Sequence, residues 1–339
     1  MSEKRNTAAR DRFDGAGIHA WYGGKTILVT GGAGYIATNL LHALRDVKCR
    51  IFRLDRPGTV FEPVGGEAEV NDLEADVRDP AAWEAALNRA DIVFHFAAQT
   101  STYVANADPP ADLDINVLPM VRLLEVCRTR NWHKVILFSS TVTIVGLPER
   151  LPVDESFPDR PVTVYDLHKM MAEQYLKYYA AQGFVTAAVL RLANVYGPGP
   201  ASSRPDRGIL NQMTRRALSG EVLTVYGRGD QLRDYVHVED VAGAFLRAAM
   251  HAADLNGGHY VIGSGRGYSL TEAMNLIADR VAVKTGRRVS VEHVDPPSPQ
   301  SPIEFRNFVA DTGRFAGLTG WKAHYTLERG IDQTIERLS

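Results

Sequence analysis

The chain has little of what would place it in several common classes of protein. Its 339 residues include only two cysteines, Cys49 and Cys127, and their spacing indicates neither a disulfide framework nor a metal site. No apolar run approaches the roughly 18 residues that a membrane-spanning helix needs. The formal net charge is −2, which gives no electrostatic case for binding nucleic acid or an anionic membrane. We therefore expect two buried thiols, no bound metal and a cytoplasmic protein.

The N-terminal segment and the overall composition limit the possible domain organisations. Residues 1–24 are polar and charged, without the apolar centre of a targeting signal. They are expected to form a flexible lead-in, in which Trp21 and Tyr22 can pack against the rest of the chain. With 45% hydrophobic residues and no internal repeat, the chain can bury a large core. This indicates one large α/β unit or two closely connected lobes.

A glycine-rich turn is the most informative segment of the sequence. The β-rich apolar residues 26–29 precede it, and residues 39–44 after it are apolar at helical spacing. Between them, Gly31, Gly34 and Ala37 follow the spacing G-x-x-G-x-x-A. Such a turn lets the backbone approach a pyrophosphate, which then faces the N-terminus of the following helix. The residues expected to contact a dinucleotide here are Gly31, Gly34, Tyr35 and Ile36.

An acidic residue at the end of a second expected strand supports dinucleotide binding. Residues 49–54 are typical of a strand, and Asp55 follows them about twenty residues beyond the glycines. An acid at this position can bind an adenosine ribose, whereas the alternative is an aspartate that only caps the turn. The carboxylate would repel a 2′-phosphate, which favours NAD over NADP, although the neighbouring Arg56 weakens that preference.

The rest of the chain alternates between strand-like and helix-like segments, as in βαβ units. Further strands are expected at residues 91–97, 134–138, 186–191 and 259–263, and helices at residues 117–127, 170–176 and 210–218. We expect a Rossmann-type, doubly wound parallel sheet over residues 25–190. A smaller, mainly C-terminal α/β lobe over residues 191–339 is expected to bind the substrate, with segments near residues 234–263 returning to the first lobe.

Tyr165 and Lys169 are four residues apart, so a helix would place them on one face. Tyrosine acts as a general base only if its pKa of about 10 falls, and a nearby ammonium group lowers it. The pattern alone is common and usually carries no chemistry, but after a dinucleotide turn it indicates a catalytic pair.

Thr141 and Thr143 follow the expected strand at residues 134–138, at the edge where open parallel sheets bind their ligands. A hydroxyl there can share a proton with the substrate oxygen and Tyr165. The alternative is that these hydroxyls only terminate the strand and cap the loop.

In combination, these motifs resemble the extended short-chain dehydrogenase/reductases, the family of nucleotide-sugar epimerases and dehydratases, from about Lys25 to Trp321. Residues 76–79 are similar to the family's adenine-contacting acid loop, and residues 95–98 resemble the strand end that lies against the cofactor. The residues that the resemblance assigns to NAD are Gly31, Gly34, Tyr35, Ile36, Asp55, Asp76, Val77, Phe96, Ala97, Ala98, Asn116, Tyr165 and Lys169.

The resemblance also implies a site for a nucleotide-diphosphate sugar. In relatives, residues equivalent to Asn194 and Arg233 contact the diphosphate region. Relatives commonly place a further arginine near the start of the segment Pro299–Pro302, where this chain has none, and Arg306 is a candidate replacement. An alternative for Arg233 is a surface ion pair with Asp230 or Asp234. The residues assigned to the substrate are Thr141, Thr143, Asn194, Arg233 and Arg306.

The residues after Thr141 indicate which reaction to expect. Relatives that perform 4,6-dehydration carry an Asp-Glu pair where this chain has Val142 and Thr143, and decarboxylating relatives carry a glutamate. The segment is most similar to the UDP-glucose 4-epimerase pattern, although Val145 replaces the usual tyrosine. The resemblance therefore implies NAD-dependent epimerisation of a nucleotide-activated sugar at C4, through a transient 4-keto intermediate.

In that reaction, the resemblance implies that Tyr165 takes the hydroxyl proton, Lys169 holds the ribose and lowers the pKa of Tyr165, and Thr141 orients the shared proton. It also implies a homodimer. Two alternatives stay open: a nucleotide-deoxysugar ketoreductase with net turnover of NAD(P)H, and a non-catalytic protein that senses NAD or a sugar nucleotide. The nucleotide base, the sugar, the carbon that is epimerised and the pathway also stay open.

Overall fold

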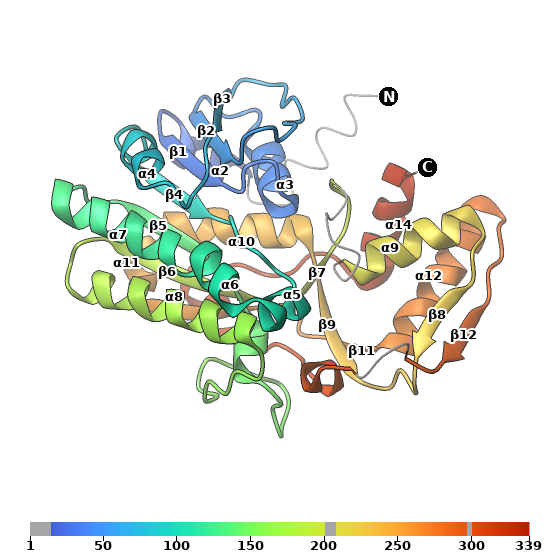
Figure 1. Ribbon diagram of the computed structural model, residues 1–339. Helices are drawn as coiled ribbons and strands as arrows, with labels where there is room; N and C mark the ends of the chain where they lie inside the picture. Colours follow the sequence, from blue (N-terminus) through green and yellow to red (C-terminus); the bar gives the residue numbers. More distant parts are fainter. Residues whose placement is uncertain (1–14, 201–207, 297–299, 339) are drawn as a thin grey trace.

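The computed structural model describes residues 15–200, 208–296 and 300–338, which contain a central sheet of seven parallel strands (Figure 1). Its spatial order is β10-β6-β5-β4-β1-β2-β3. The strands are β1 (Thr26–Thr30), β2 (Arg50–Asp55), β3 (Glu69–Glu74), β4 (Ile92–His95), β5 (Val135–Thr141), β6 (Thr186–Leu192) and β10 (Gly258–Ile262). The order reverses between β1 and β4, and open α/β sheets bind ligands outside the carboxyl ends of the strands at such a point.

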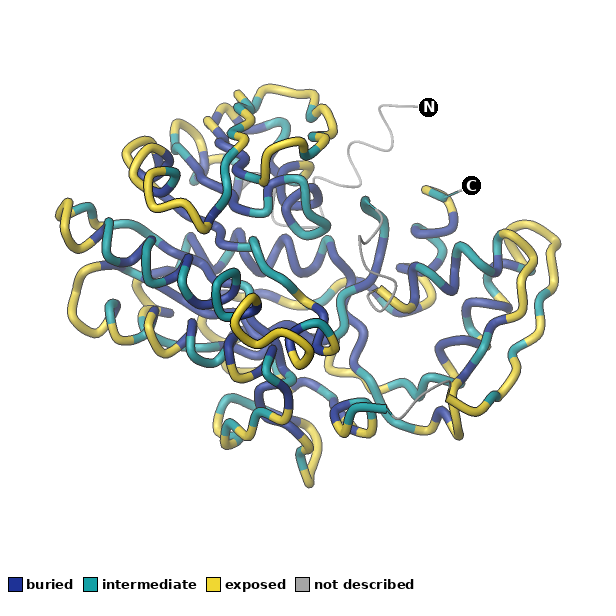
Figure 2. The backbone as a smooth tube through the Cα atoms, viewed as in Figure 1, coloured by how far each residue is buried: buried dark blue, intermediate teal, exposed yellow. Residues whose placement is uncertain are grey.

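Helices cover both faces of this sheet, so its strands, apart from the edge strand β3, are mostly buried (Figure 2). One face carries α2 (Gly15–Tyr22), α3 (Tyr35–Leu44), α10 (Val238–Met250), α11 (Ala252–Leu255) and α13 (Gly313–Thr319). The other carries α4 (Pro80–Leu87), α5 (Thr102–Ala107), α6 (Pro109–Asn116), α7 (Leu118–Arg130) and α8 (Val164–Ala181). Burial on both faces explains why β1 and β4 read as continuous apolar runs rather than as alternating ones.

A second lobe lies beside the carboxyl ends of the strands, on the right in Figure 1. Its strands are β7 (Asn194–Tyr196), β9 (Leu232–His237) and β11 (Gly267–Ser269) in one sheet, and β8 (Leu223–Tyr226) with β12 (Val291–Val294) in another. Its helices are α9 (Ile209–Ser219), α12 (Leu270–Thr285) and α14 (Leu327–Leu338). These three helices enclose a separate apolar core with Leu223 and Val225 of β8. Two short 3-10 helices are η2 (Val142–Val145), which follows β5 and contacts α8, and η3 (Pro302–Phe305).

The predicted fold class is confirmed, but not every element was expected. Strand β3 was missed because it is a sheet edge whose residues, Glu69–Glu74, are mostly polar and only partly buried. Strands β8 and β12 were missed because they form a short two-stranded ribbon in a lobe where the apolar periodicity is weak. The division into a cofactor lobe and a substrate lobe stays a prediction.

The lead-in expected over residues 1–24 is shorter in the structure. Residues 15–22 form α2, because Ile18 and Tyr22 bury apolar surface against the core. The Tyr22 hydroxyl donates to the carbonyl of Leu246 in α10 at 2.9 Å. The expectation of flexibility is therefore wrong for this helix, and residues 1–14 lie outside the described part of the chain.

The cysteines are free and buried, as expected. Burial raises the pKa of the Cys49 thiol to about 11 and that of Cys127 to about 12, so both are inert near neutral pH. Within residues 15–200, 208–296 and 300–338, none of the helices combines the length and apolar character needed to cross a membrane. The same residues contain no group of three or more His, Cys, Asp or Glu side chains arranged for a metal ion.

Two helical glycines should respond to alanine in opposite ways. A Cβ at Gly330 in α14 would lie 2.6 Å from Cε2 and Cζ of the buried Tyr196 ring, whereas a Cβ at Gly317 in α13 would meet open space. Overpacking of this kind costs about 1–3 kcal/mol, while alanine in an unhindered helix gains roughly 0.5–1 kcal/mol. We expect Gly330→Ala to lower the free energy of unfolding and Gly317→Ala to raise it slightly, as measured by urea denaturation. A stabilised Gly330→Ala variant would contradict the close packing of α14 on β7.

Candidate active site

The turn between β1 and α3 has room only for glycine at three positions. Gly31 has φ +65°, and a Cβ there would lie 2.9 Å from the Ala97 nitrogen. A Cβ at Gly34 would lie 2.8 Å from the Gly31 carbonyl oxygen. Gly32, which the G-x-x-G spacing left out, is equally constrained, because its Cβ would lie 2.6 Å from that of Arg53. The turn is thus pressed against β2 and the residues after β4, and no side chain caps the N-terminus of α3, which leaves its first amides for an anion.

Asp55, at the carboxyl end of β2, lies against this turn. Its Oδ2 accepts the Ala33 amide at 3.1 Å, and its Oδ1 accepts the Arg56 amide at 2.8 Å. A carboxylate has about four lone-pair sites, so two hydroxyl groups can still donate to it. The glycine-rich turn (the glycine cradle, residues 31–34) and the Asp55 carboxylate beside it therefore fit a dinucleotide, with the pyrophosphate at α3 and a ribose at Asp55.

The other loops at the carboxyl edge are held in place by internal hydrogen bonds. Hydrogen bonds from Arg78 hold the pKa of the Asp76 carboxyl below its usual range. The carbonyl of Val77 accepts the indole N–H of Trp83 at 2.7 Å. After β4, the amides of Phe96 and Ala97 both donate to the Thr30 hydroxyl, each at 3.2 Å. Ala98 follows and is only partly buried. All these residues border the turn or the strand ends, where the sequence placed them.

The side chains of Tyr35 and Ile36 have partners within the protein. The Tyr35 hydroxyl donates to the Gly197 carbonyl at 2.6 Å and accepts from the Asn211 amide at 3.2 Å, so it joins the two lobes. The Ile36 side chain packs against the apolar core. Any contact of these residues with a ligand at the turn is therefore expected to come from the main chain.

Asn116, at the end of α6, belongs to a buried polar network that the sequence did not reveal. Its Nδ2 donates to the Gln99 carbonyl and to Asp112 Oδ1, both at 2.9 Å. Asp112 Oδ2 in turn lies 2.7 Å from Nδ1 of His168, on α8. Asn116 Oδ1 is buried and has no hydrogen-bond partner among the described residues. Such an atom is satisfied by a ligand or by water.

Helix α8 carries the predicted catalytic pair. Thr163 caps its N-terminus, with its side chain accepting the Asp166 amide at 3.2 Å. Tyr165 and Lys169 are both buried, and the Lys169 ammonium lies 4.0 Å from the centre of the Phe138 ring. Burial lowers the pKa of Lys169 to about 7, although the charges of Glu173 and Asp112 oppose the shift.

The predicted hydroxyl residues lie next to this helix and share a partner that the sequence did not indicate. Thr141 Oγ1 and Thr143 Oγ1 are 2.7 Å apart, and the Thr143 hydroxyl donates to Oδ1 of Asp166. Asp166 is completely buried. The hydroxyls therefore do more than end the strand, because they connect β5 and η2 to the start of α8.

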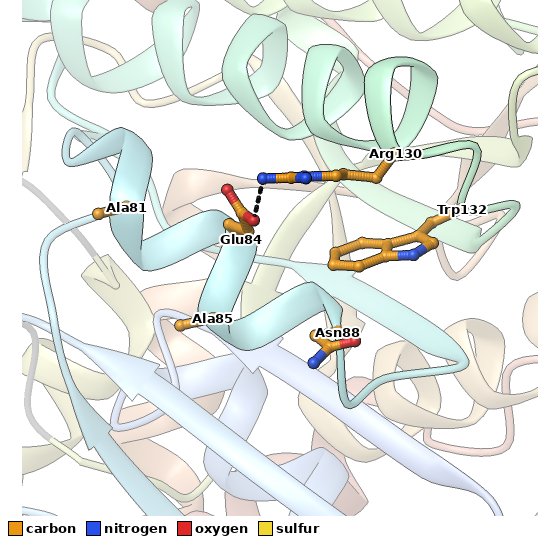
Figure 3. Close-up of a pocket in the computed structure, with 6 residues that line it drawn as sticks. All are labelled: Ala81, Glu84, Ala85, Asn88, Arg130 and Trp132. Atoms are coloured by element: carbon orange, nitrogen blue, oxygen red, sulfur yellow. Dashed lines mark hydrogen bonds and ion pairs between the residues drawn. The ribbon is translucent and has the colours of Figure 1, made fainter.

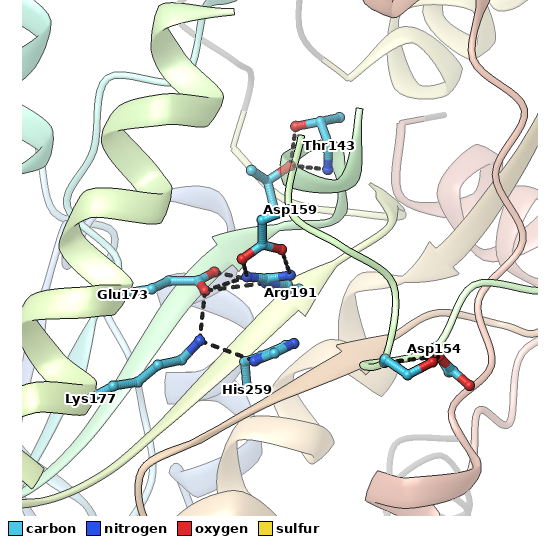
Figure 4. Close-up of polar contacts among 9 residues, drawn as sticks. Thr143, Asp154, Asp159, Glu173, Lys177, Arg191 and His259 are labelled. Carbon is cyan, nitrogen blue, oxygen red and sulfur yellow. Dashed lines mark hydrogen bonds and ion pairs between the residues drawn. The ribbon is translucent and has the colours of Figure 1, made fainter. Parts of the chain in front are cut away.

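Arg191 in β6 fixes α8 against the sheet (Figure 4). Its guanidinium donates to both oxygens of Glu173 on α8 and, at 2.6 and 2.9 Å, to those of Asp159. Lys177 also approaches Glu173, at 3.3 Å, and lies 3.0 Å from His259 Nδ1 (Figure 4). Burial alone would raise the pKa of Glu173, but the hydrogen bonds from Arg191 bring it below its usual range. Glu173 is thus a charged group that holds the helix carrying Tyr165 and Lys169.

The predicted substrate residues of the second lobe form one cluster. Arg233 in β9 donates to the carbonyls of Glu304, at 2.6 Å, and Arg306. Arg306 Nη2 lies 3.5 Å from Asn194 Oδ1, at the start of β7. Arg306 is buried, and its Nε has no hydrogen-bond partner among the described residues. Burial and the charge of Arg233 lower the pKa of Arg306 to about 10.

The alternative for Arg233, an ion pair with Asp230 or Asp234, is wrong. Asp230 pairs with Arg228, and Asp234 accepts the amides of Ser264, Gly265 and Ala310 instead. In the described part of the chain, neither Arg233 nor Arg306 forms an ion pair with a carboxylate. Two adjacent guanidinium groups that are largely buried and have no direct carboxylate partner are suited to an anionic ligand. Pro299, in the segment where relatives place an arginine, lies outside the described residues.

A hollow elsewhere on the surface has none of these features (Figure 3). It lies between α4 and the end of α7, and an ion pair between Glu84 and Arg130 borders it. Its remaining lining residues are Ala81, Ala85, Asn88 and Trp132. None of them belongs to the clusters described above.

Comparisons with known proteins agree on one family. The profile described as "NAD dependent epimerase/dehydratase family" matches residues 27–263. The chain is 30% identical to a putative UDP-glucose 4-epimerase of Methanocaldococcus jannaschii, over 91% of this chain and 97% of that protein. It is also 30% identical to a UDP-glucose 4-epimerase of Mycolicibacterium smegmatis, with the same coverage.

Solved structures give the same result. The UDP-glucose 4-epimerase of Thermotoga maritima with UDP-glucose superposes with a TM-score of 0.81, at 28% identity, over 92% of this chain and 98% of that chain. The UDP-glucose 4-epimerase of Thermus thermophilus in complex with NAD gives a TM-score of 0.80, at 30% identity and with the same coverage.

The buried Lys169 should reduce the stability of the ligand-free protein. Its folded pKa of about 7 lies below the ordinary value of about 10.4, so between these values the unfolded chain binds a proton that the folded chain does not. Stability therefore rises with pH from about 7 to about 10. We expect Lys169→Met to raise the free energy of unfolding at pH 6 by on the order of 2 kcal/mol, and this gain to shrink by pH 9.5. Urea denaturation of ligand-free protein at both pH values measures it, and a less stable variant at pH 6 would contradict the buried charge.

Proposed function

Because this chain belongs to the NAD-dependent epimerase/dehydratase family, we propose that it is an NAD-dependent nucleotide-sugar epimerase that inverts C4 through a transient 4-keto sugar. The observation that carries the proposal is the packing of α8, which contains Tyr165 and Lys169, beside the carboxyl end of β5. Lys169 lies over the Phe138 ring, and Thr143, which bonds to Thr141, also bonds to Asp166. This grouping lies on the edge that also holds the glycine cradle. Val142 and Thr143 supply no carboxylate at the positions where dehydrating relatives carry an acid pair.

The residues of this chain then have separate tasks. Tyr165 takes the proton from the C4 hydroxyl, with Thr141 beside the reacting oxygen. Lys169 holds the nicotinamide ribose and, when charged, lowers the pKa of Tyr165. The glycine turn and Asp55 would hold NAD, which would supply a reversible hydride acceptor for C4. After the ketone has turned over in the site, Tyr165 would return the proton to its oxygen.

The substrate that fits best is a UDP-hexose, since the relatives described above are named for it. Arg233 and Arg306 are positioned to hold the diphosphate between the lobes, with Asn194 next to them. Charge-assisted hydrogen bonds from arginine are strong enough to bind such a group. The late arginine that relatives carry is missing here, so Arg306 takes its place.

The protein is further proposed to act as a cytoplasmic homodimer. Leu167, Tyr175 and Tyr178 of α8 are 40%, 41% and 60% exposed, and their spacing of 8 and 3 residues places them on one side of the helix. A second copy of α8 would cover this apolar stripe. Light scattering after gel filtration tests the oligomeric state.

The redox balance of the reaction is the direct test of the proposal. An epimerase returns its hydride, so UDP-glucose and UDP-galactose should interconvert with no change of mass and no net NADH. Mass spectrometry and NMR identify the product, and absorbance at 340 nm follows NADH. Stoichiometric NADH turnover would indicate a ketoreductase, and loss of water would indicate a dehydratase. Silence on a broad panel of sugar nucleotides would favour a sensing role.

Replacing Arg233 should affect the sugar nucleotide far more than the cofactor. We expect Arg233→Ala to raise the KM for UDP-galactose roughly 10- to 100-fold, because a charge-assisted contact of about 1.5–3 kcal/mol is lost. NAD affinity, measured by calorimetry, should change less than threefold. Arg228→Ala is the matched control, since Arg228 is exposed and pairs only with Asp230 among the contacts described. An unchanged KM in Arg233→Ala would remove this residue from the site.

A further inference from the structure

Asp166 is a buried carboxylate directly after Tyr165 in sequence, and the proposed reaction does not use it. Each of its oxygens accepts a hydrogen bond from a threonine hydroxyl. Oδ1 accepts from Thr143, and Oδ2 accepts from Thr163 at 2.7 Å. Two hydroxyl groups that donate to a carboxyl group favour its ionised form.

The ionised carboxylate sets the direction of a chain of hydroxyl groups. An ionised carboxylate has no hydrogen to give, so Thr143 must donate to it. Thr143 has a single hydroxyl hydrogen, and therefore it accepts the hydrogen bond from Thr141 across the 2.7 Å that separates their oxygens. The Thr141 oxygen also accepts the Thr143 amide at 3.2 Å. The hydrogen of Thr141 thus points along the chain toward Asp166, and a lone pair of its oxygen stays available to a ligand.

We propose that Thr141, Thr143 and Asp166 form a second proton path, which accepts the proton of the sugar hydroxyl in parallel with Tyr165. The inference rests on the proposed function, because it requires Thr141 to face the reacting hydroxyl. Asp166 acts through the two threonines and does not itself touch the sugar.

The proton balance of the path is complete. When the C4 hydride passes to the bound NAD, the O–H bond of the C4 hydroxyl breaks and the C4–O bond becomes a carbonyl. The released proton joins Thr141, the Thr141 proton moves to Thr143, and the Thr143 proton moves to Asp166, which becomes a carboxylic acid. Every hydrogen bond in the chain then runs in the opposite direction, with no movement of the oxygens. Thr141 now donates to the ketone oxygen, and the same three transfers in reverse return the proton.

Kinetics in a Tyr165→Phe background isolate this path. The single variant should keep a residual epimerisation rate, because a proton acceptor remains. Adding Asp166→Asn should lower the residual kcat at least tenfold, since an amide cannot take up the proton. Adding Thr143→Val instead should lower the residual kcat by a similar factor. Serine at the same position, Thr143→Ser, keeps the hydroxyl group and should therefore keep the residual rate of Tyr165→Phe. In the variant with Asp166→Asn, the KM for the sugar nucleotide should stay within threefold, because Asp166 does not touch the sugar.

A matched control separates the path from a structural role of Asp166. Thr163→Val removes the other hydroxyl bonded to the same carboxylate and the cap of α8, but it leaves Thr143 and Thr141 in place. In the Tyr165→Phe background it should lower Tm without lowering the residual kcat more than threefold. The residual rate should also depend non-linearly on the deuterium fraction of the solvent, because several protons move together, and Thr143→Val should abolish this curvature.

Three results would overturn the inference. The first is a Tyr165→Phe variant with no residual turnover at all. The second is a residual rate that neither Asp166→Asn nor Thr143→Val changes. The third comes from neutron diffraction of the wild-type protein, which does not depend on activity, and is a deuterium of Thr141 that points away from Thr143. A wild-type protein that epimerises no sugar nucleotide would instead contradict the proposed function. The neutron map would then still show in which direction the hydrogen bonds from Thr141 through Thr143 to Asp166 run.

Discussion

The active-site geometry depends on the burial of ionisable side chains along one face of α8. Tyr165, Asp166, His168, Lys169 and Glu173 all lie inside the protein within this one helix. Burying a polar or charged group is costly unless it has a partner, so each imposes a requirement on another part of the chain. Asp166 bonds to Thr143, His168 to Asp112, and Glu173 to Arg191. These contacts connect α8 to η2, α6 and β6, and together they fix its position relative to the sheet.

Lys169 is the exception that indicates function. It is buried over the Phe138 ring without a direct ion pair among the described residues, and burial lowers its pKa to about 7. Natural proteins tolerate an unfavourable group of this kind where activity needs it, and the cost to stability is offset elsewhere. The same reasoning applies to the two arginines of the second lobe. Burial lowers the pKa of both Arg233 and Arg306, and the charge of Arg233 lowers the pKa of Arg306 further, which an anionic ligand between the lobes would relieve.

Much of this could be predicted from the sequence, because the relevant information is local. The glycine turn is a matter of backbone space over four residues, and the structure shows that a side chain at Gly31 or Gly34 would collide with backbone atoms. Asp55 ends a strand next to that turn because parallel neighbours in the sheet end at the same edge, as Thr30 and Leu54 do. Tyr165 and Lys169 lie on one face because helical spacing alone places them there. The fold class follows from the alternation of apolar strands and helices.

What the sequence determined by itself was therefore the fold class, from the alternation of strands and helices, together with the glycine turn and the placement of Tyr165 and Lys169 on one helical face, which follow from neighbours within one turn or one helix. Only the tertiary structure decided which groups meet across long separations. Asp166 reaches Thr143, 23 residues away, and Arg306 reaches Asn194 across 112 residues. Tyr35 bonds to Gly197, 162 residues away, so its phenol joins the lobes. Such partners depend on how two lobes and several helices pack, and no spacing along the chain encodes the direction in which a buried polar side chain finds its hydrogen bond.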